Sequence, residues 1–279
     1  MILKAKAIAK SRNLPLGIFT FPAEDGIKKN AGRLYSTEEK LGILAELGAD
    51  FTVLADFASV AALTPEAFIE EVLTGKLGAV ECVAGFNFRF GRGASGDAAM
   101  LSKILESLGA HATVCDELTS DGKTVSTSAI REYITSGDMR SAAKLLGAPY
   151  FLSGKVMHGN KDGRRLGYPT VNTPIEDGKI VPRLGVYMSA VRLDGGIFPA
   201  LTNVGKCPTF TERKVHAETY ILGYEGDLYG EKIEVYLLDF LREERRFSSP
   251  EELIMQINVD KSRVLDKIGD KIWQELGLN

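Results

Sequence analysis

The sequence has no long hydrophobic run and no excess of positive charge. None of its apolar stretches approaches the roughly 18 residues that a membrane-spanning helix needs, so we expect no membrane span. The 34 Lys and Arg residues are outnumbered by 37 Asp and Glu residues, which gives a net charge of −3. This balance argues against non-specific nucleic-acid binding but allows a local basic pocket. The N-terminus lacks the apolar core of a signal peptide, which predicts a cytoplasmic protein.

Cysteine and histidine are scarce as well, with three residues of each. Cys82, Cys115 and Cys207 form no CxxC pair and no metal-ligand spacing, so we expect free thiols in a reducing compartment. The sequence contains no H-E-x-x-H and no Ser/His/Asp motif. It also has no G-x-x-x-x-G-K-[ST], which excludes a P-loop kinase.

The length of 279 residues suggests two domains, and the two halves differ in pattern. In residues 1–148, predicted helices alternate with short apolar runs such as FTVLADF (51–57), which is typical of a parallel α/β sheet. Ser36 with Glu39, and Thr64 before a proline, mark two helix starts.

From residue 149 onward, five strand-like runs follow one another without helices between them, which predicts an antiparallel barrel or sandwich. A capping box at 249–252 begins a C-terminal helix. The apolar stripe of this helix, which we expect to pack on the barrel, consists of Leu253, Ile257, Val264, Ile268 and Ile272.

GRGASG (91–96) fits the dinucleotide pattern G-x-G-x-x-G. That pattern works only where the glycine turn follows its strand at once and meets pyrophosphate at a helix N-terminus. Here GFNFRF separates it from the preceding strand, so a loop is expected instead.

The segment 154–172, GKVMHGNKDGRRLGYPTVN, combines four glycines with four basic residues. Glycine spacing alone fits a phosphate-binding loop and a solvated barrel loop equally well. Thr170 and Asn172 favour the first interpretation, because residues two apart in an extended segment share a face. Both supply hard oxygen donors of the kind that Mg²⁺ uses together with nucleotide phosphates, and Pro169 makes the approach rigid.

Five motifs of this half occur in the order typical of riboflavin kinases. GRRLGYPTVN (163–172) resembles the family's G-R-x-L-G-[FY]-P-T-[AV]-N, and NVGKCPTF (203–210) resembles its N-[IV]-G-x-x-P-T-F. The other three motifs are HAETYIL (216–222), DLYGEKIEV (227–235) and LREERRFSSPEEL (241–253). Over residues 153–268 the sequence is similar to bacterial riboflavin kinase with FAD synthetase, a family of two-domain proteins.

This resemblance implies a kinase that transfers the γ-phosphate of ATP to the ribityl 5′-hydroxyl of riboflavin and so produces FMN. It implies that Thr170 and Asn172 hold Mg²⁺ and that Glu218 accepts the hydroxyl proton. The implied ATP-binding residues are Gly154, Lys155, His158, Gly159, Gly163, Arg164, Gly167 and Pro169. The implied flavin-binding residues are Tyr229, Arg242, Glu244 and Phe247.

The first half resembles the family's FMN adenylyltransferase domain through GFNFRFG (85–91) and STSAIR (126–131). The remnant of that site would comprise Asn87, Thr127, Ser128 and Arg131. The family's H-x-G-H signature occurs nowhere in the chain. In the family this signature follows the first strand of the domain, which lies at the centre of the sheet. Its absence would leave two neighbouring strands with unpaired backbone groups.

We therefore expect an incomplete, Rossmann-type nucleotidyltransferase-like α/β domain without its first strand over residues 1–148. A riboflavin-kinase-type antiparallel barrel with a C-terminal helix should follow over 149–279. A sequence that starts late and a genuine remnant both fit the first half, and the intact later motifs favour the late start. We expect no efficient FAD formation by this chain.

Other functions fit parts of the sequence. A full bifunctional kinase and FAD synthetase requires the missing signature, whereas a non-catalytic flavin-binding regulator needs neither a metal nor the base Glu218. A nucleic-acid-binding barrel lacks the expected stripe of aromatic and basic residues. The expected partners are small molecules, and the sequence does not indicate an oligomeric state.

Overall fold

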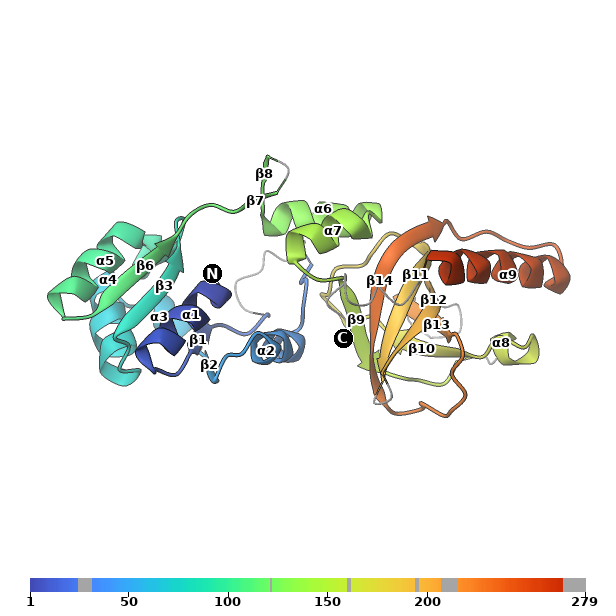
Figure 1. Ribbon diagram of the computed structural model, residues 1–279, viewed down its shortest axis with the longest axis horizontal. Helices are drawn as coiled ribbons and strands as arrows, with labels where there is room; N and C mark the ends of the chain where they lie inside the picture. The colour runs from blue at the N-terminus through green and yellow to red at the C-terminus, as the bar shows by residue number, and fades with distance from the viewer. Residues whose placement is uncertain (25–31, 121, 160–161, 194–195, 207–214, 268–279) are drawn as a thin grey trace. The chain divides into compact units, whose positions relative to one another are not determined.

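The computed structural model describes residues 1–24, 32–120, 122–159, 162–193, 196–206 and 215–267. Internal contacts divide the chain into two compact units, residues 1–124 and 125–279. The sequence pattern predicted a domain boundary after residue 148. The contacts instead group the two helices before that point with the barrel. In Figure 1 the first unit is coloured blue to green and the second green to red.

The first unit contains both helices and short strands. Its helices are α1 (Ile2–Arg12), α2 (Thr37–Glu46), α3 (Phe57–Ala61), α4 (Pro65–Ala67), η1 (Phe68–Lys76), η2 (Arg92–Ala94) and α5 (Ala98–Ser107). Its strands are β1 (Gly17–Thr20), β2 (Phe51–Leu54), β3 (Glu81–Gly85), β4 (Arg89–Phe90), β5 (Gly96–Asp97), β6 (His111–Cys115), β7 (Thr119–Ser120) and β8 (Lys123–Thr124).

Local side-chain chemistry begins these helices where the sequence predicted. At the start of α2, the Glu39 N–H donates to Ser36 Oγ (3.2 Å) and the Ser36 N–H donates to Glu39 Oε2 (2.8 Å), a complete capping box. Thr64 caps α4, with Pro65 at the first helical position, and η1 continues it as a π-helix. The helical pattern from 65 onward was therefore predicted correctly, although not its π-helical geometry.

The parallel strands of this unit form two separate pairs. β1 pairs with β2 and β3 pairs with β6, and in the described part of the chain no strand joins β1 to β3. The core lies under β3 and β6, where η1 and α5 contribute Phe68, Ile69, Leu101 and Leu105. The predicted α/β domain without a strand between its two halves is confirmed.

The second unit begins with two helices and continues as a sheet. Its helices are α6 (Thr127–Ser136), α7 (Met139–Leu146), α8 (Asp162–Arg165) and α9 (Pro250–Lys267). Its strands are β9 (Phe151–Lys155), β10 (Thr170–Pro174), β11 (Gly185–Leu193), β12 (Gly196–Lys206), β13 (Val215–Ile221) and β14 (Lys232–Arg242).

The six strands form the predicted antiparallel barrel, in the order β10-β13-β12-β11-β14-β9. The two outer strands meet where the Met157 N–H donates to the Asn172 carbonyl oxygen at 2.8 Å. Buried hydroxyls link three strands inside, since Thr202 Oγ1 lies 2.7 Å from Ser189 Oγ and 2.9 Å from Thr219 Oγ1. Asn172 therefore lies at the seam where the barrel closes.

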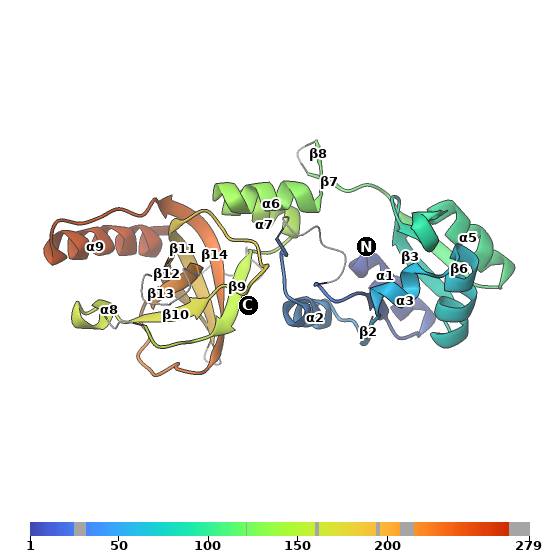
Figure 2. The ribbon, with the colours of Figure 1, turned by 180° about the vertical axis from the view of Figure 1, so that it is seen from behind.

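Helix α9 runs beside the barrel in both views (Figures 1 and 2) and contacts β12. Of the expected stripe, Val264 is fully buried and Leu253 and Ile257 are half-buried. Ile268 and Ile272 lie outside the described residues. Within the ranges that the structure describes, no helix is both long and apolar enough to cross a bilayer.

Helices α6 and α7 are attached to the barrel by specific contacts. Arg140 on α7 forms an ion pair with Asp239 on β14, with 3.0 Å between Nη2 and Oδ2. Gly137 ends α6 in the left-handed conformation (φ 87°), and a side chain there would crowd Arg183 and Phe240. These contacts explain why the compact unit begins before the barrel itself.

Candidate active site

A row of polar side chains crosses three adjacent strands of the barrel. Asn172 on β10 lies opposite Glu218 on β13, and Glu218 lies opposite Asn203 on β12. Directly opposed residues of antiparallel strands share a face, with Cβ atoms about 5 Å apart. The register therefore places a carboxylate between two carboxamides.

Thr170 adds a hydroxyl to this row. Its Oγ1 donates a hydrogen bond of 2.8 Å to Glu218 Oε1. Thr170 and Asn172 lie on one face of β10, as their spacing predicted. A hydroxyl that donates its single proton to Glu218 keeps both lone pairs for another partner. The predicted metal ligands and the predicted base thus form one cluster.

Two glycines bring backbone close to these ligands. A Cβ atom on Gly159 would overlap the Asn172 carboxamide, and one on Gly163 would overlap the Tyr168 carbonyl oxygen and lie 3.3 Å from Thr170 Oγ1. Only glycine leaves this space, so these positions allow a loop to lie directly over both oxygen donors.

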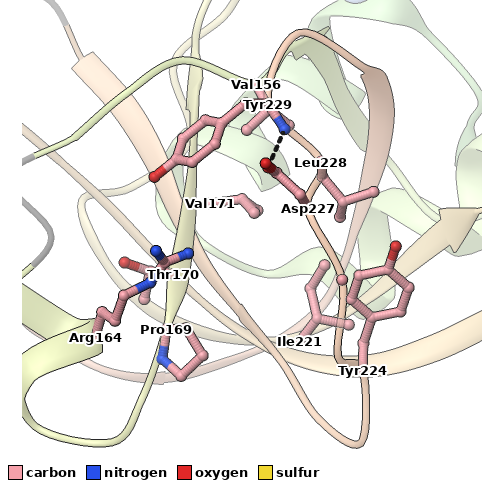
Figure 3. Close-up of a pocket in the computed structure, with 11 residues that line it drawn as sticks. Val156, Arg164, Pro169, Thr170, Val171, Ile221, Tyr224, Asp227, Leu228 and Tyr229 are labelled. Carbon is pink, nitrogen blue, oxygen red and sulfur yellow. Dashed lines mark hydrogen bonds between the residues drawn. The ribbon is translucent and has the colours of Figure 1, made fainter.

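A small pocket that is partly open to solvent lies beside Thr170. Figure 3 shows Arg164, Pro169 and Thr170 on one side of it, and Tyr224 and Asp227 on the other. The Tyr229 N–H donates to Asp227 Oδ1 at 3.0 Å, which fixes the turn that leads into β14. The pocket thus combines an exposed guanidinium with apolar and aromatic walls, a composition suited to a nucleotide.

Tyr229 and His158 form one aromatic contact, with ring centroids 3.9 Å apart. The resemblance implied ATP for His158 and flavin for Tyr229. The structure places the Tyr229 ring against His158, and Tyr229 lines the same pocket as Arg164. This placement favours a nucleotide contact for Tyr229.

The remaining predicted ATP residues lie at the edge of the site. A Cβ atom on Gly154 in β9 would meet Thr173 Cγ2 at 2.6 Å, so close packing between β9 and β10 is enough to require glycine there. Lys155 is exposed at the end of β9. Gly167 takes a left-handed conformation (φ 85°) directly after α8, which turns the chain toward β10.

Three predicted flavin residues lie at the end of β14 and in the segment that follows it. Arg242 Nε donates to the buried Asp260 Oδ2 on α9 (2.8 Å), and Asp260 Oδ1 accepts from Gln256 Nε2 (2.8 Å). The Phe247 ring lies 5.8 Å from the Arg242 guanidinium. Glu244 Oε1 accepts a hydrogen bond of 2.9 Å from Asn203 Nδ2. Helix α9 therefore orients the segment that carries these residues.

The residues of the predicted adenylyltransferase remnant lie on different units. Asn87 is exposed in the turn after β3. Thr127 and Ser128 are exposed in the first turn of α6, and Arg131 is half-buried one turn later. GRGASG (91–96) forms the connection between β4 and β5, which contains η2, and does not follow a parallel strand directly.

Thr170 and Asn172 can bind a magnesium ion only together with other ligands. They offer two neutral oxygens, and within the described ranges no three His, Cys, Asp or Glu side chains group as metal ligands. Mg²⁺ binds through few protein ligands where phosphates and waters supply the others. A metal here would therefore arrive with a nucleotide.

Sequence reasoning did not assign a role to several residues of this site. Asp227 and Tyr224 line the pocket, and Asn203 lies beside Glu218. Asp227 and Asn203 belong to the DLYG and NVG motifs, so the signal was in the sequence. Cys207 and Lys161 lie outside the described residues.

Comparisons with known proteins agree with this geometry. A family model described as riboflavin kinase matches residues 146–268, and one described as FAD synthetase matches residues 1–129. The bifunctional riboflavin kinase/FMN adenylyltransferase of Bacillus subtilis is 32% identical over 270 residues, which cover 94% of this chain and 85% of that protein. The Escherichia coli (strain K12) protein of the same name is 34% identical over 258 residues, covering 90% and 82%.

A solved structure also matches both units. The crystal structure of a protein named macrolide-efflux protein, from Streptococcus pneumoniae, has a TM-score of 0.83 at 28% identity and covers 96% of this chain and 89% of its own. The family models, the relatives and this structure extend over both halves of the chain. The chain therefore belongs to the family of bifunctional riboflavin kinase/FMN adenylyltransferases.

Proposed function

We propose that the barrel unit transfers the γ-phosphate of ATP to the ribityl 5′-hydroxyl of riboflavin, which yields FMN and ADP. The observation that carries this proposal is the hydrogen bond from Thr170 to Glu218, beside the pocket that Arg164 lines. A base and a metal-binding hydroxyl in contact are what phosphoryl transfer to an alcohol requires, because such catalysis is mainly positioning and charge stabilisation.

Each residue has a defined task in this proposal. Glu218 is exposed beside the pocket and accepts the proton of the 5′-hydroxyl as its oxygen forms the new bond to phosphorus. The bond from that phosphorus to the bridging oxygen of ADP breaks, and ADP carries away the charge. Thr170 and Asn172 would hold Mg²⁺, which when bound neutralises charge on the phosphates. Arg164 adds a second positive charge at the pocket wall.

Nucleotide and flavin occupy different ends of the site in this proposal. His158 and Tyr229 border the nucleotide, and Gly159 and Gly163 let the backbone lie over its phosphates. Arg242, Glu244 and Phe247 border the flavin beyond Glu218. The use of Mg²⁺ and a cytoplasmic location stay predictions.

The direct test is an assay of the 279-residue chain with riboflavin, ATP and MgCl₂, followed by chromatography of flavins and nucleotides. We expect FMN and ADP in equal amounts, and loss of both when ATP is replaced by a non-hydrolysable analogue. Riboflavin binding without ADP formation would overturn the proposal and support a non-catalytic flavin-binding regulator.

The second candidate activity is adenylyl transfer from ATP to FMN. The match of residues 1–129 to the FAD synthetase model favours it. The chain contains no H-x-G-H to stabilise the transferring phosphates, and among the residues that the structure describes no strand joins β1 and β3. We therefore assign FMN formation, and not FAD formation, to a polypeptide of this sequence.

A further inference from the structure

Asn203 lies next to the proposed base but has no role in the chemistry described so far. It is opposite Glu218 in the register of β12 and β13. Its Nδ2 donates to Glu244 Oε1 at 2.9 Å. Its Oδ1 is shielded from solvent and accepts no hydrogen bond from any residue that the structure describes. Only one of the two polar atoms of this carboxamide therefore has a hydrogen-bond partner.

Glu244, the partner of Asn203, lies close to the backbone of β12. A Cβ atom on Gly205, two residues along the same face of β12, would overlap the Glu244 carboxylate. Glycine at 205 thus lets Glu244 lie flat on the strand and reach Asn203. This arrangement fixes the orientation of the carboxamide, because Nδ2 must face Glu244 and Oδ1 must face elsewhere.

A buried acceptor without a donor is costly, by about 1–3 kcal/mol. The two neighbouring side chains, Glu218 and Glu244, do not supply the donor, since a carboxylate only accepts hydrogen bonds. A ligand that carries hydroxyl groups can. Glu244 is itself exposed, so its side chain can move aside to admit one.

We propose that Asn203 is a substrate-binding residue, whose Oδ1 accepts a hydrogen bond from a secondary hydroxyl of the ribityl chain. This inference rests on the proposed function, since it takes Glu218 as the group beside the reacting 5′-hydroxyl. The secondary hydroxyls next to that end of the chain reach the neighbouring strand position while the 5′-oxygen faces Glu218. Asn203 thereby selects a polyhydroxyl chain over an alkyl chain.

The test combines Asn203→Ala with riboflavin analogues that each lack one secondary ribityl hydroxyl. For the wild-type chain we expect one analogue to lose about three- to tenfold in kcat/KM, the value of a neutral hydrogen bond. Asn203→Ala should lose a similar factor with riboflavin and lose nothing further with that analogue. Losses that multiply for every analogue would overturn the proposal.

Two further measurements separate this inference from a merely structural role. Asn203→Asp keeps the shape and the acceptor oxygen, so it should still discriminate between riboflavin and that analogue, whereas Asn203→Ala should not. Loss of this discrimination in Asn203→Asp would contradict a role of Asn203 as a hydrogen-bond acceptor. If Asn203→Ala does not fold, Asn203→Ser enters the same analogue series.

A binding readout keeps the two proposals distinguishable. Riboflavin fluorescence titrations report affinity whether or not FMN forms. Suppose that the wild-type protein makes no FMN, while Asn203→Ala weakens the binding of riboflavin but not the binding of the deoxygenated analogue. The kinase assignment would then fail, and the proposed contact of Asn203 with riboflavin would stand. Equal riboflavin affinities of wild type and Asn203→Ala would overturn the contact. Ser262→Ala, on the exposed face of α9, is the control variant.

Discussion

The hydroxyl of Thr170 donates a hydrogen bond to Oε1 of Glu218, with 2.8 Å between the two oxygens. The residues are 48 positions apart and meet because β10 and β13 pair in antiparallel register. In the proposed function, this hydroxyl would hold the metal and this carboxylate would accept the proton, so both would act on the same reacting oxygen.

Glu218→Gln should lower FMN formation by about 10²–10⁴-fold, the usual contribution of a general base. The glutamine keeps the shape and can still accept from Thr170, so riboflavin affinity should change little. Chromatography of FMN and fluorescence titration of riboflavin measure the two effects. A normal rate would refute the assignment of the base. Glu132→Gln, on the exposed surface of α6, serves as the matched control.

Thr170→Val should weaken binding of MgATP at least about tenfold, or 1.4 kcal/mol, because it removes one of two protein oxygens for the metal. Binding of ATP in the presence of a chelator should not change. Calorimetry with and without Mg²⁺ separates the two cases. Thr170→Ser, which keeps the hydroxyl, should restore most of the affinity. Equal losses in both conditions would show that Thr170 does not bind a metal.

Gly159→Ala should reduce kcat/KM for ATP while changing the thermal unfolding temperature little. The added methyl would occupy the space of the Asn172 carboxamide and displace it. The control is Gly42→Ala in α2, where no heavy atom lies within 4 Å and alanine favours the helix by about 1 kcal/mol. Thermal unfolding and steady-state kinetics of both variants test this. An active Gly159→Ala enzyme would mean that Asn172 can shift without loss.

Tyr168→Phe should raise KM for ATP several-fold while leaving the fold intact. The Tyr168 hydroxyl donates to Asn258 Oδ1 on α9 at 2.9 Å, and its ring packs edge-on against Tyr220. The variant removes only the first contact, worth about 1 kcal/mol. Asn258→Ala should have the same effect, and the double variant should add nothing further. Additive effects would show that the two residues act separately.

A polypeptide of the printed sequence should convert riboflavin to FMN without accumulating FAD. The chain has no H-x-G-H, and β1 and β3 have no strand between them within the described ranges. An assay with FMN, ATP and Mg²⁺ measures the second step alone. FAD turnover comparable to the rate of FMN formation would refute this prediction.

Much of the local structure could be predicted from the sequence. Ser36 and Glu39 form their capping box, and Thr64 with Pro65 begins its helix, because these contacts involve residues three or four apart. The change from helix-strand alternation to successive strands correctly indicated an α/β unit and an antiparallel barrel. The ordered motifs of the second half pointed to Thr170, Asn172 and Glu218 as one site.

Contacts between distant segments could not be predicted in this way. The ring contact between Tyr229 and His158 depends on the turn before β14, and the flavin contact expected for Tyr229 stays a prediction. Asn203 appeared only as a motif residue until the register set it opposite Glu218. The glycine at 159 was expected to approach phosphate, and the structure adds that it also makes room for Asn172.

The sequence alone determined the types of element, their order, the family and the chemical groups available for catalysis. Only the tertiary structure decided which of these groups meet. Helix caps and strand patterns depend on neighbours along the chain, so short segments of the sequence are enough to predict them. Register and barrel closure depend on the simultaneous pairing of strands such as β10, β13 and β12, and a shift of one residue would turn Glu218 away from Thr170 and Asn203.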